Sequence, residues 1–147
     1  MTRLDAGSIL TEYSKLGMVD YICAGSIVTL IGLTWISDQQ QWDYQTTKYK
    51  YLDTAKYSPR FGFTRDQLEL GFCTTGFFAY SRHPNFVCEQ CVWWTFYLWS
   101  ATLADKPYNW TVVGPALYSL VFAGSTPITE YISKSKYPEY EDYQKQC

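Results

Sequence analysis

Three apolar stretches, each close to the length that crosses a bilayer, constrain the fold of this chain more than any other feature. They cover residues 18–36, 86–103 and 108–128. A helix needs about 20 apolar residues to cross the hydrocarbon core, and helices or closed barrels alone satisfy their backbone polar groups there. The sequence therefore predicts an all-α integral membrane helical bundle with about three transmembrane helices and short surface helices. Residues 1–17 form a polar lead-in, and residues 18–147 form a single membrane domain.

The placement of positive charge agrees with three spans. In such a topology, the segment between the first two spans and the tail after the third lie on the same side of the membrane. Nine of the 12 Lys and Arg residues fall in these two segments. They are Lys48, Lys50, Lys56, Arg60, Arg65, Arg82, Lys134, Lys136 and Lys145. Such a bias is typical of the cytoplasmic side of membrane proteins. A mean hydropathy of -0.22 keeps open the alternative of a soluble bundle with membrane-like core helices.

The overall composition excludes some classes of protein and leaves the organelle open. Residues 1–17 lack the apolar core of a cleavable signal and are too acidic for a transit peptide. The first span is then the insertion signal, and the endoplasmic reticulum and the mitochondrial inner membrane both remain possible. A net charge of -2 without a basic stripe gives no support to nucleic-acid binding.

The five cysteines are interpreted as reduced thiols, because they are odd in number and scattered along the chain. Cys88 and Cys91 form one C-x-x-C pair, which could join His83 and Cys73 in a metal site. A single such pair on a membrane helix is more often a pair of packing residues, and we therefore expect no metal.

Local signals predict the elements around the spans. Pro84 favours the first turn of the second span, and residues 44–75 read as a loop with short helical pieces. Gly114-Pro115 and Thr126-Pro127 predict kinks or local unwinding in the third span. Residues 137–145 predict a short surface helix, whose tyrosines are expected to lie at the membrane interface.

A concentrated positive site precedes the second span. Arg82 and His83 stand just before the free amides of a helix N-terminus, which together suit a phosphate group. Asn85 and Glu89 follow on one face of that helix. A carboxylate inside a span is costly, so Glu89 requires a partner. The simpler interpretation is that Arg82 extends to lipid headgroups and that Glu89 pins helices together.

An ordered set of motifs resembles a known family. The segments are Gly76-Phe77-Phe78-Ala79-Tyr80-Ser81-Arg82-His83-Pro84-Asn85-Phe86-Val87-Cys88-Glu89, then Trp93-Trp94, Thr129-Glu130, and Lys136-Tyr137-Pro138-Glu139-Tyr140-Glu141-Asp142-Tyr143-Gln144, with Asp38-Gln39-Gln40-Gln41-Trp42 earlier in the chain. Together they resemble the C-terminal half of the steroid 5-alpha-reductase-like membrane proteins, especially a branch of unknown function.

The resemblance implies an all-helical membrane domain that binds NADPH and reduces an activated carbon-carbon double bond. Asn85 and Glu89 match polar residues that hold the cofactor, and Arg82 and His83 match the signature before them. Asp38 and Glu130 match acidic positions of the branch. The cofactor-binding candidates are therefore Arg82, His83, Asn85, Glu89, Asp38, Glu130 and Tyr137, while the catalytic residues stay unknown.

Two residues that differ from the family pattern, and the short length of the chain, weaken the expectation of an intact NADPH site. Phe86 replaces a usual tyrosine and Cys88 a usual glycine, so the cofactor site can have weakened or been lost. Members of the family usually carry several more spans before this region, which makes the chain resemble half of an enzyme.

Three hypotheses therefore stay open at the level of sequence. The first is an incomplete NADPH-dependent reductase-like domain. The second is a non-catalytic accessory subunit of a larger membrane complex, such as an organellar respiratory assembly. The third is an S-adenosylmethionine-dependent methyltransferase, because the related isoprenylcysteine carboxyl methyltransferases share Arg-His-Pro. Membrane lipids and other membrane subunits are the expected partners.

Overall fold

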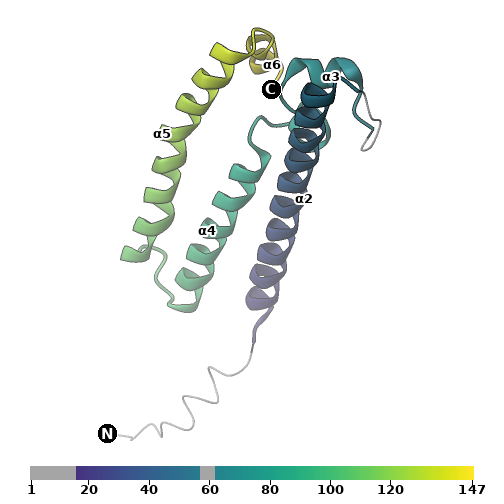
Figure 1. Ribbon diagram of the computed structural model, residues 1–147. Helices are drawn as coiled ribbons and strands as arrows, with labels where there is room; N and C mark the ends of the chain where they lie inside the picture. The colour runs from purple at the N-terminus through teal and green to yellow at the C-terminus, as the bar shows by residue number, and fades with distance from the viewer. Residues whose placement is uncertain (1–15, 57–61) are drawn as a thin grey trace, which may run out of the picture.

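The computed structural model describes residues 16–56 and 62–147, and all regular structure within these ranges is helical (Figure 1). The elements are α2 (Met18–Thr54), α3 (Arg65–Leu70), η1 (Gly76–Ala79), α4 (Pro84–Leu103), η2 (Trp110–Val112), α5 (Val113–Lys136) and α6 (Tyr140–Gln146). The predicted all-α class is confirmed for this part of the chain. The polar lead-in lies outside the described residues except for its last two.

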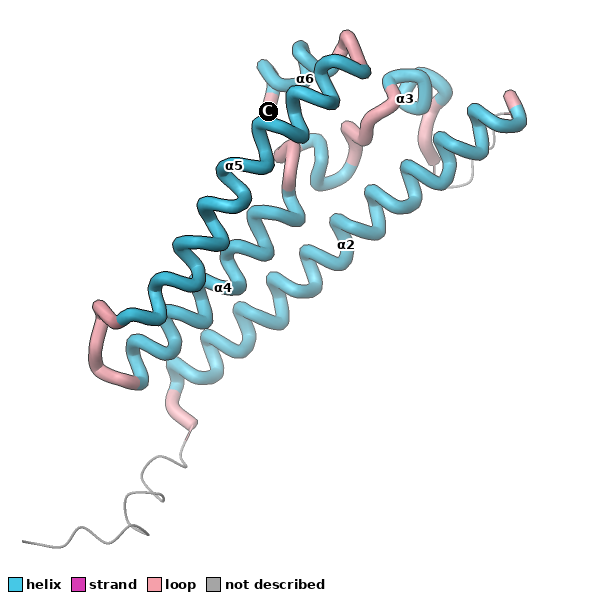
Figure 2. Tube along the Cα trace, turned by 60° about the vertical axis from the view of Figure 1, so that its left-hand side comes forward, coloured by secondary structure: helices cyan, strands magenta, loops and turns pink. Residues whose placement is uncertain are grey.

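Three long helices lie side by side in a row, with α4 between α2 and α5 (Figures 1 and 2). The short elements α3, η1 and α6 gather at one end of the row. The segment between α2 and α4 and the C-terminal tail therefore lie at the same end, as the three-span topology predicts. A single row of helices buries little of either face, so most apolar side chains on the long helices remain exposed.

Two helical segments are long and apolar enough to cross a membrane, namely Met18–Thr54 and Trp110–Lys136. Only 6% of each apolar stretch is buried, whereas a core helix of a soluble protein would bury most of its apolar residues. These segments suggest a membrane-embedded protein. Helix α4 has 20 residues, but Glu89, Gln90 and its tryptophans reduce its apolar character. The third predicted span thus remains a prediction.

Helix α2 is longer than the sequence predicted. The expected loop from residue 44 is wrong at its start, because the helix continues to Thr54 and ends at Ala55, where φ is 51°. No glycine or proline interrupts residues 37–54. A 37-residue helix spans about 55 Å, well beyond a hydrocarbon core of about 30 Å. Its C-terminal part therefore extends beyond the hydrocarbon core, where short elements pack against it.

The buried core lies at this end of the row, which we term the head: the C-terminal part of α2 together with α3, η1 and α6. Its central cluster consists of Tyr44, Phe63, Leu68, Cys73 and Phe78. Tyr140 and Tyr143 of α6 are also buried, and both rings contact Phe72, with centroids 5.1 and 5.4 Å away. The expectation that these two tyrosines are interfacial is therefore wrong. Their apolar rings instead complete the core of the head.

Helix α5 is continuous, although the sequence predicted unwinding at two prolines. Pro115 lies in its first turn, where a missing amide proton costs nothing. Pro127 lies inside the helix without ending it. The Thr129 hydroxyl donates to the Ser125 carbonyl over 3.0 Å and supports the backbone around that proline.

Candidate functional site

The N-terminus of α4, which we term its mouth, follows a tight loop that precedes Pro84. The Ser81 hydroxyl accepts a hydrogen bond from the His83 backbone amide over 3.3 Å. Pro84 then opens the helix with its fixed φ. Because His83 is the N-cap residue, Arg82 and His83 are held at the junction between the head and the row of long helices.

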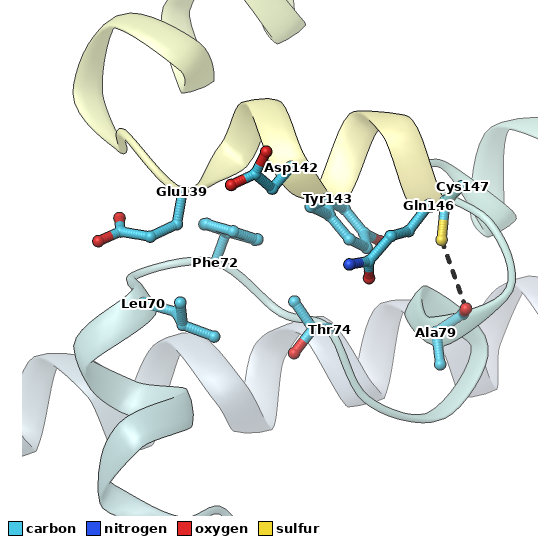
Figure 3. Close-up of a pocket in the computed structure, with 9 residues that line it drawn as sticks. All are labelled: Leu70, Phe72, Thr74, Ala79, Glu139, Asp142, Tyr143, Gln146 and Cys147. Atoms are coloured by element: carbon cyan, nitrogen blue, oxygen red, sulfur yellow. Dashed lines mark hydrogen bonds between the residues drawn. The ribbon is translucent and has the colours of Figure 1, made fainter.

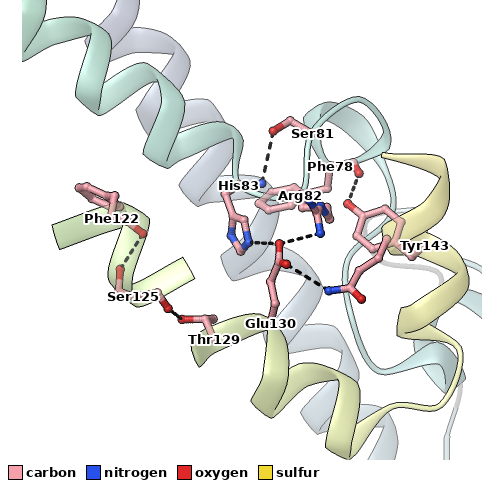
Figure 4. A network of polar contacts seen from close by, with 10 residues as sticks. Phe78, Ser81, Arg82, His83, Phe122, Ser125, Thr129, Glu130 and Tyr143 are labelled. Carbon is pink, nitrogen blue, oxygen red and sulfur yellow. Dashed lines mark hydrogen bonds and ion pairs between the residues drawn. The ribbon is translucent and has the colours of Figure 1, made fainter. Parts of the chain in front are cut away.

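Glu130 of α5 joins the two basic residues. One of its oxygens lies 2.8 Å from Arg82 Nη1 and 3.1 Å from His83 Nε2. Its other oxygen accepts from Gln144 Nε2 of α6 over 3.1 Å. The side chains of Arg82, His83 and Glu130 are 29%, 20% and 15% exposed. Figure 4 shows this carboxylate between the mouth of α4 and the C-terminal helix. Three residues singled out from sequence thus form one ion cluster.

A cavity of about 220 Å³ lies beside this cluster. Its walls come from α2, from the segment of residues 72–83, from the first turn of α4, and from α5 and α6. The lining residues are Gln41, Phe72, Cys73, Phe78, Arg82, His83, Asn85, Phe86, Thr129, Ser133, Tyr140 and Tyr143. Arginine carries five N–H donors, so the ion pair with Glu130 leaves donors for a second anion. The cavity can therefore take a small polar group with negative charge.

Asp38 and Asn85 form a pair at the edge of this cavity. The Asn85 amide donates to the Asp38 carboxylate over 3.0 Å, which links α4 to α2. Both residues were predicted from sequence as cofactor-binding candidates, and the fold brings them together. The bond also fixes the amide of Asn85, which lines the cavity.

Gln41 is a polar residue of the cavity to which the sequence reasoning gave no role. Its Oε1 atom is buried and has no hydrogen-bond partner among the described residues. The available signal was its spacing of three residues from Asp38, which puts both on one face of a helix.

Glu89 lies elsewhere and is exposed rather than buried. Its carboxylate interacts with the hydroxyl of Tyr118 on α5, and it does not line the cavity. The expectation of a buried carboxylate is therefore wrong for this chain. In a single row of helices, even a side chain at the flank between α4 and α5 is left partly uncovered, because no further described helix packs over it.

Tyr137 does not line the cavity. It lies at the C-cap of α5, where its ring is 5.8 Å from that of the lining residue Phe72. Its hydroxyl lies 3.4 Å from Lys48 Nζ, which also donates to the Gly71 carbonyl over 3.0 Å. Lys48 is 4% exposed and lies 4.9 Å from the centre of the Tyr49 ring. These contacts tie α2 to the corner between α5 and α6. Tyr137 therefore acts here in the packing of the head.

Burial perturbs the ionisation of several groups in the head, and three of them lie outside the long helices. It raises the pKa of the Cys73 thiol. It also raises the pKa of the Tyr140 phenol, with a smaller contribution from the nearby negative charge of Glu130. The pKa of the Tyr143 phenol is raised too, first by burial. All three groups are thus neutral at pH 7 and serve the head as uncharged packing groups.

A second cavity of about 580 Å³ lies between α6 and the 70–79 segment (Figure 3). Glu139 and Asp142 stand on its rim, and the Cys147 thiol contacts the Ala79 carbonyl over 3.4 Å. None of the described residues that line it is basic, which disfavours anions. Across residues 16–56 and 62–147, no three His, Cys, Asp or Glu side chains are grouped to hold a metal ion.

These features define a protein whose regular structure is helical throughout the described residues, with membrane-length helices and a cavity beside basic residues at a helix N-terminus. The chain belongs to the family described as Protein of unknown function (DUF1295), whose model matches residues 6–147. DUF1295 is a steroid 5-alpha-reductase-like family, so the resemblance seen in the sequence holds at that level.

One relative extends this finding. The chain is 40% identical over 128 residues to the uncharacterized protein C594.04c of Schizosaccharomyces pombe. The match covers 87% of this chain and 37% of the relative, so the chain spans little more than a third of the length of that protein. No solved structure matches the chain.

Proposed function

We propose that this chain is the NADPH-binding part of a membrane-embedded reductase-like protein of the enone, steroid or lipid double-bond class, and that it is incomplete by itself. The observation that carries the proposal is the cavity at the mouth of α4, where Arg82, His83 and Asn85 meet. Membership of a steroid 5-alpha-reductase-like family supports the same choice.

The residues present fit part of a phosphorylated dinucleotide. Arg82 supplies bidentate donors suited to a phosphate, and Asn85 supplies an amide. Gln41 of α2 also lines the cavity. When bound, NADPH would provide a hydride for reduction. The contribution of this chain is to hold and orient the cofactor at the junction of the head and the long helices.

The size of the cavity supports an incomplete site. A pocket for a drug-sized ligand has about 300–1,000 Å³, whereas this cavity has about 220 Å³. It can enclose one portion of the cofactor, with the rest covered by another segment or chain. The relative of Schizosaccharomyces pombe is long enough to contain such a segment. A substrate pocket would then lie outside the region described.

Binding of NADPH to the purified protein in detergent tests this proposal. Arg82→Ala is expected to weaken binding at least tenfold, which is the ~1.4 kcal/mol scale of one charged contact. Arg65→Ala is the matched control, because Arg65 is an exposed arginine of α3 paired with Glu69. S-adenosylmethionine in the same titration tests the methyltransferase alternative. If wild-type protein and Arg82→Ala bind NADPH with equal affinity, the cavity beside Arg82 is not the cofactor site.

A second function is favoured by the ion cluster itself. Glu130 already neutralises Arg82, and an internal counterion suits a structural brace between α4, α5 and α6. The exposed apolar faces also suit an accessory subunit that packs against other membrane proteins. Under this alternative the chain should co-purify with a stable membrane complex and bind no NADPH. Reduction of enones by the isolated monomer would contradict it.

A further inference from the structure

The buried tyrosines of this protein use their hydroxyl groups in one consistent way, with a single exception. In the part of the chain that the structure describes, the buried tyrosines are Tyr44, Tyr97, Tyr140 and Tyr143. The hydroxyls of Tyr44, Tyr97 and Tyr143 each donate to a backbone carbonyl. The hydroxyl of Tyr140 has no hydrogen-bond partner in the described structure, although a buried tyrosine usually finds one.

This unpaired hydroxyl is accessible to a ligand. Tyr140 as a whole is 6% exposed. Two polar side-chain atoms of the described residues are both unpaired and fully enclosed, namely Ser37 Oγ and Gln41 Oε1, and the Tyr140 hydroxyl is not one of them. Tyr140 lines the cavity beside Arg82 and is absent from the walls of the larger cavity under α6. A group bound beside Arg82 can therefore reach the hydroxyl.

Packing and nearby charge determine what this hydroxyl can do. The Tyr140 ring lies against the rings of Phe72 and Tyr143, with centroids 5.1 and 5.7 Å away, so its orientation is fixed. Burial is the main cause that raises the pKa of the phenol, and the charges of Glu130 and Arg82 act on it in opposite directions. The phenol is therefore protonated at pH 7 and lies close to the ion cluster. A protonated phenol next to an anion donates a hydrogen bond.

The two groups on the cavity wall call for the same kind of ligand. Arg82 keeps donors for a second anion, and arginine pairs well with phosphate. A phosphate group has enough acceptor oxygens to take a hydrogen bond from Tyr140 at the same time. A cavity of about 220 Å³ has room for such a group.

We propose that Tyr140 is a ligand-binding residue whose hydroxyl donates a hydrogen bond to the phosphate group that pairs with Arg82. This inference rests on the proposed function, because it takes the cofactor as the source of that phosphate. It adds a contact from α6 to a site otherwise built at the mouth of α4. It also accounts for the one buried tyrosine hydroxyl that the protein leaves unpaired.

The substitution Tyr140→Phe tests this contact, because it keeps the ring against Phe72 and removes only the hydroxyl. The full chain in detergent is titrated with NADPH and with inorganic phosphate. Tyr140→Phe is expected to weaken both about tenfold, which is the low end of the range for a hydrogen bond to a charged group. Its thermal midpoint should equal that of wild type.

The matched control is Tyr143→Phe, which removes from the same helix a hydroxyl that donates to the Phe78 carbonyl. This variant should lower the thermal midpoint and leave both affinities unchanged. The two hydroxyls are thus distinguished by separate measurements, affinity for Tyr140 and stability for Tyr143.

The outcomes also separate this inference from the proposed function. If Arg82→Ala weakens NADPH binding while Tyr140→Phe binds both probes as wild type does, the inference is overturned and the proposed function stands. If wild-type protein binds phosphate but no NADPH, and Tyr140→Phe weakens phosphate, the phosphate contact holds and the proposed function fails. Wild-type protein that binds neither probe overturns both. A Tyr140→Phe variant that does not fold, or that loses stability with unchanged affinities, would show that the hydroxyl serves packing and would overturn the inference.

Discussion

At the scale of single residues, Glu130 is the side chain on which the candidate site depends. It accepts from Arg82, His83 and Gln144, which belong to two distant segments. A carboxylate in this position resembles the anion that the two basic residues were expected to bind. It therefore both organises the basic residues and competes with any incoming phosphate.

Replacing this carboxylate should separate the two effects. Glu130→Gln keeps the shape and removes the charge, so we expect phosphate and NADPH to bind several-fold more tightly. The free energy of unfolding should fall by about 1–3 kcal/mol, because the charged hydrogen bonds are lost. Ligand titration and thermal unfolding measure both changes. Glu141→Gln removes an exposed ion pair with Lys134 and should change neither; equal behaviour of the two variants would exclude Glu130 from this role.

The raised pKa values of neutral groups in the head predict that the protein loses stability at alkaline pH. Cys73, Tyr140 and Tyr143 have a raised pKa in the folded protein. Stability is then complete below the ordinary values of 9.0 for the thiol and 10.0 for the phenols, and it falls as pH rises toward the raised values. Unfolding curves between pH 7 and 11 should show this fall. Cys73→Ala should delay its onset, and an unchanged onset would mean that the thiol stays neutral throughout.

At the scale of elements, the turn after α3 holds the head together. Gly71 has φ +84°, and a Cβ there would lie 2.2 Å from the Tyr137 ring. Its carbonyl also accepts from Lys48. The turn thus joins α2, α3 and the corner between α5 and α6 at one position that a side chain cannot occupy.

Gly71→Ala should therefore destabilise the protein by about 1–3 kcal/mol, through strain at positive φ and the contact with Tyr137. Gly32→Ala is the matched control, since a Cβ at that helical position meets nothing within 4 Å. In a helix interior, alanine is favoured over glycine by up to about 1 kcal/mol. Urea or thermal midpoints measure both variants. A smaller loss in Gly71→Ala than in Gly32→Ala would contradict the packing described.

At the scale of the whole molecule, the row of three long helices predicts an arrangement across the membrane. The head and α6 lie at one end of the row, while the turn that contains Lys106 lies at the other (Figure 1). Two polar bonds span the interface of α2 and α4 near these ends, Asn85 with Asp38 and Trp99 with Asp20. They hold the two helices alongside one another.

Accessibility labelling of single cysteines, in a variant without the five native ones, tests this arrangement. Asp66→Cys and Glu141→Cys should react with an impermeant reagent from the same side of the membrane, and Lys106→Cys from the opposite side. Labelling of all three from one side would contradict a membrane-crossing row and leave a surface-bound or soluble protein.

The sequence by itself determined the features that depend on neighbouring residues. Apolar length predicted the long helices, Pro84 predicted the start of α4, and the tail predicted α6, because hydropathy and helix-start signals act within one segment. The cluster of Arg82 with His83 was visible for the same reason. The order of the apolar stretches also predicted that the segment between the first two spans lies on the same side as the C-terminal tail.

Only the tertiary structure decided which side chains meet. Glu130 reaches His83 across 47 positions of sequence, and Gln41 of α2 lines the same cavity. The row leaves Glu89 exposed, whereas α6 buries Tyr140 and Tyr143 against Phe72. Each outcome depends on the packing of segments that are distant in the chain, and local periodicity carries no information on that packing.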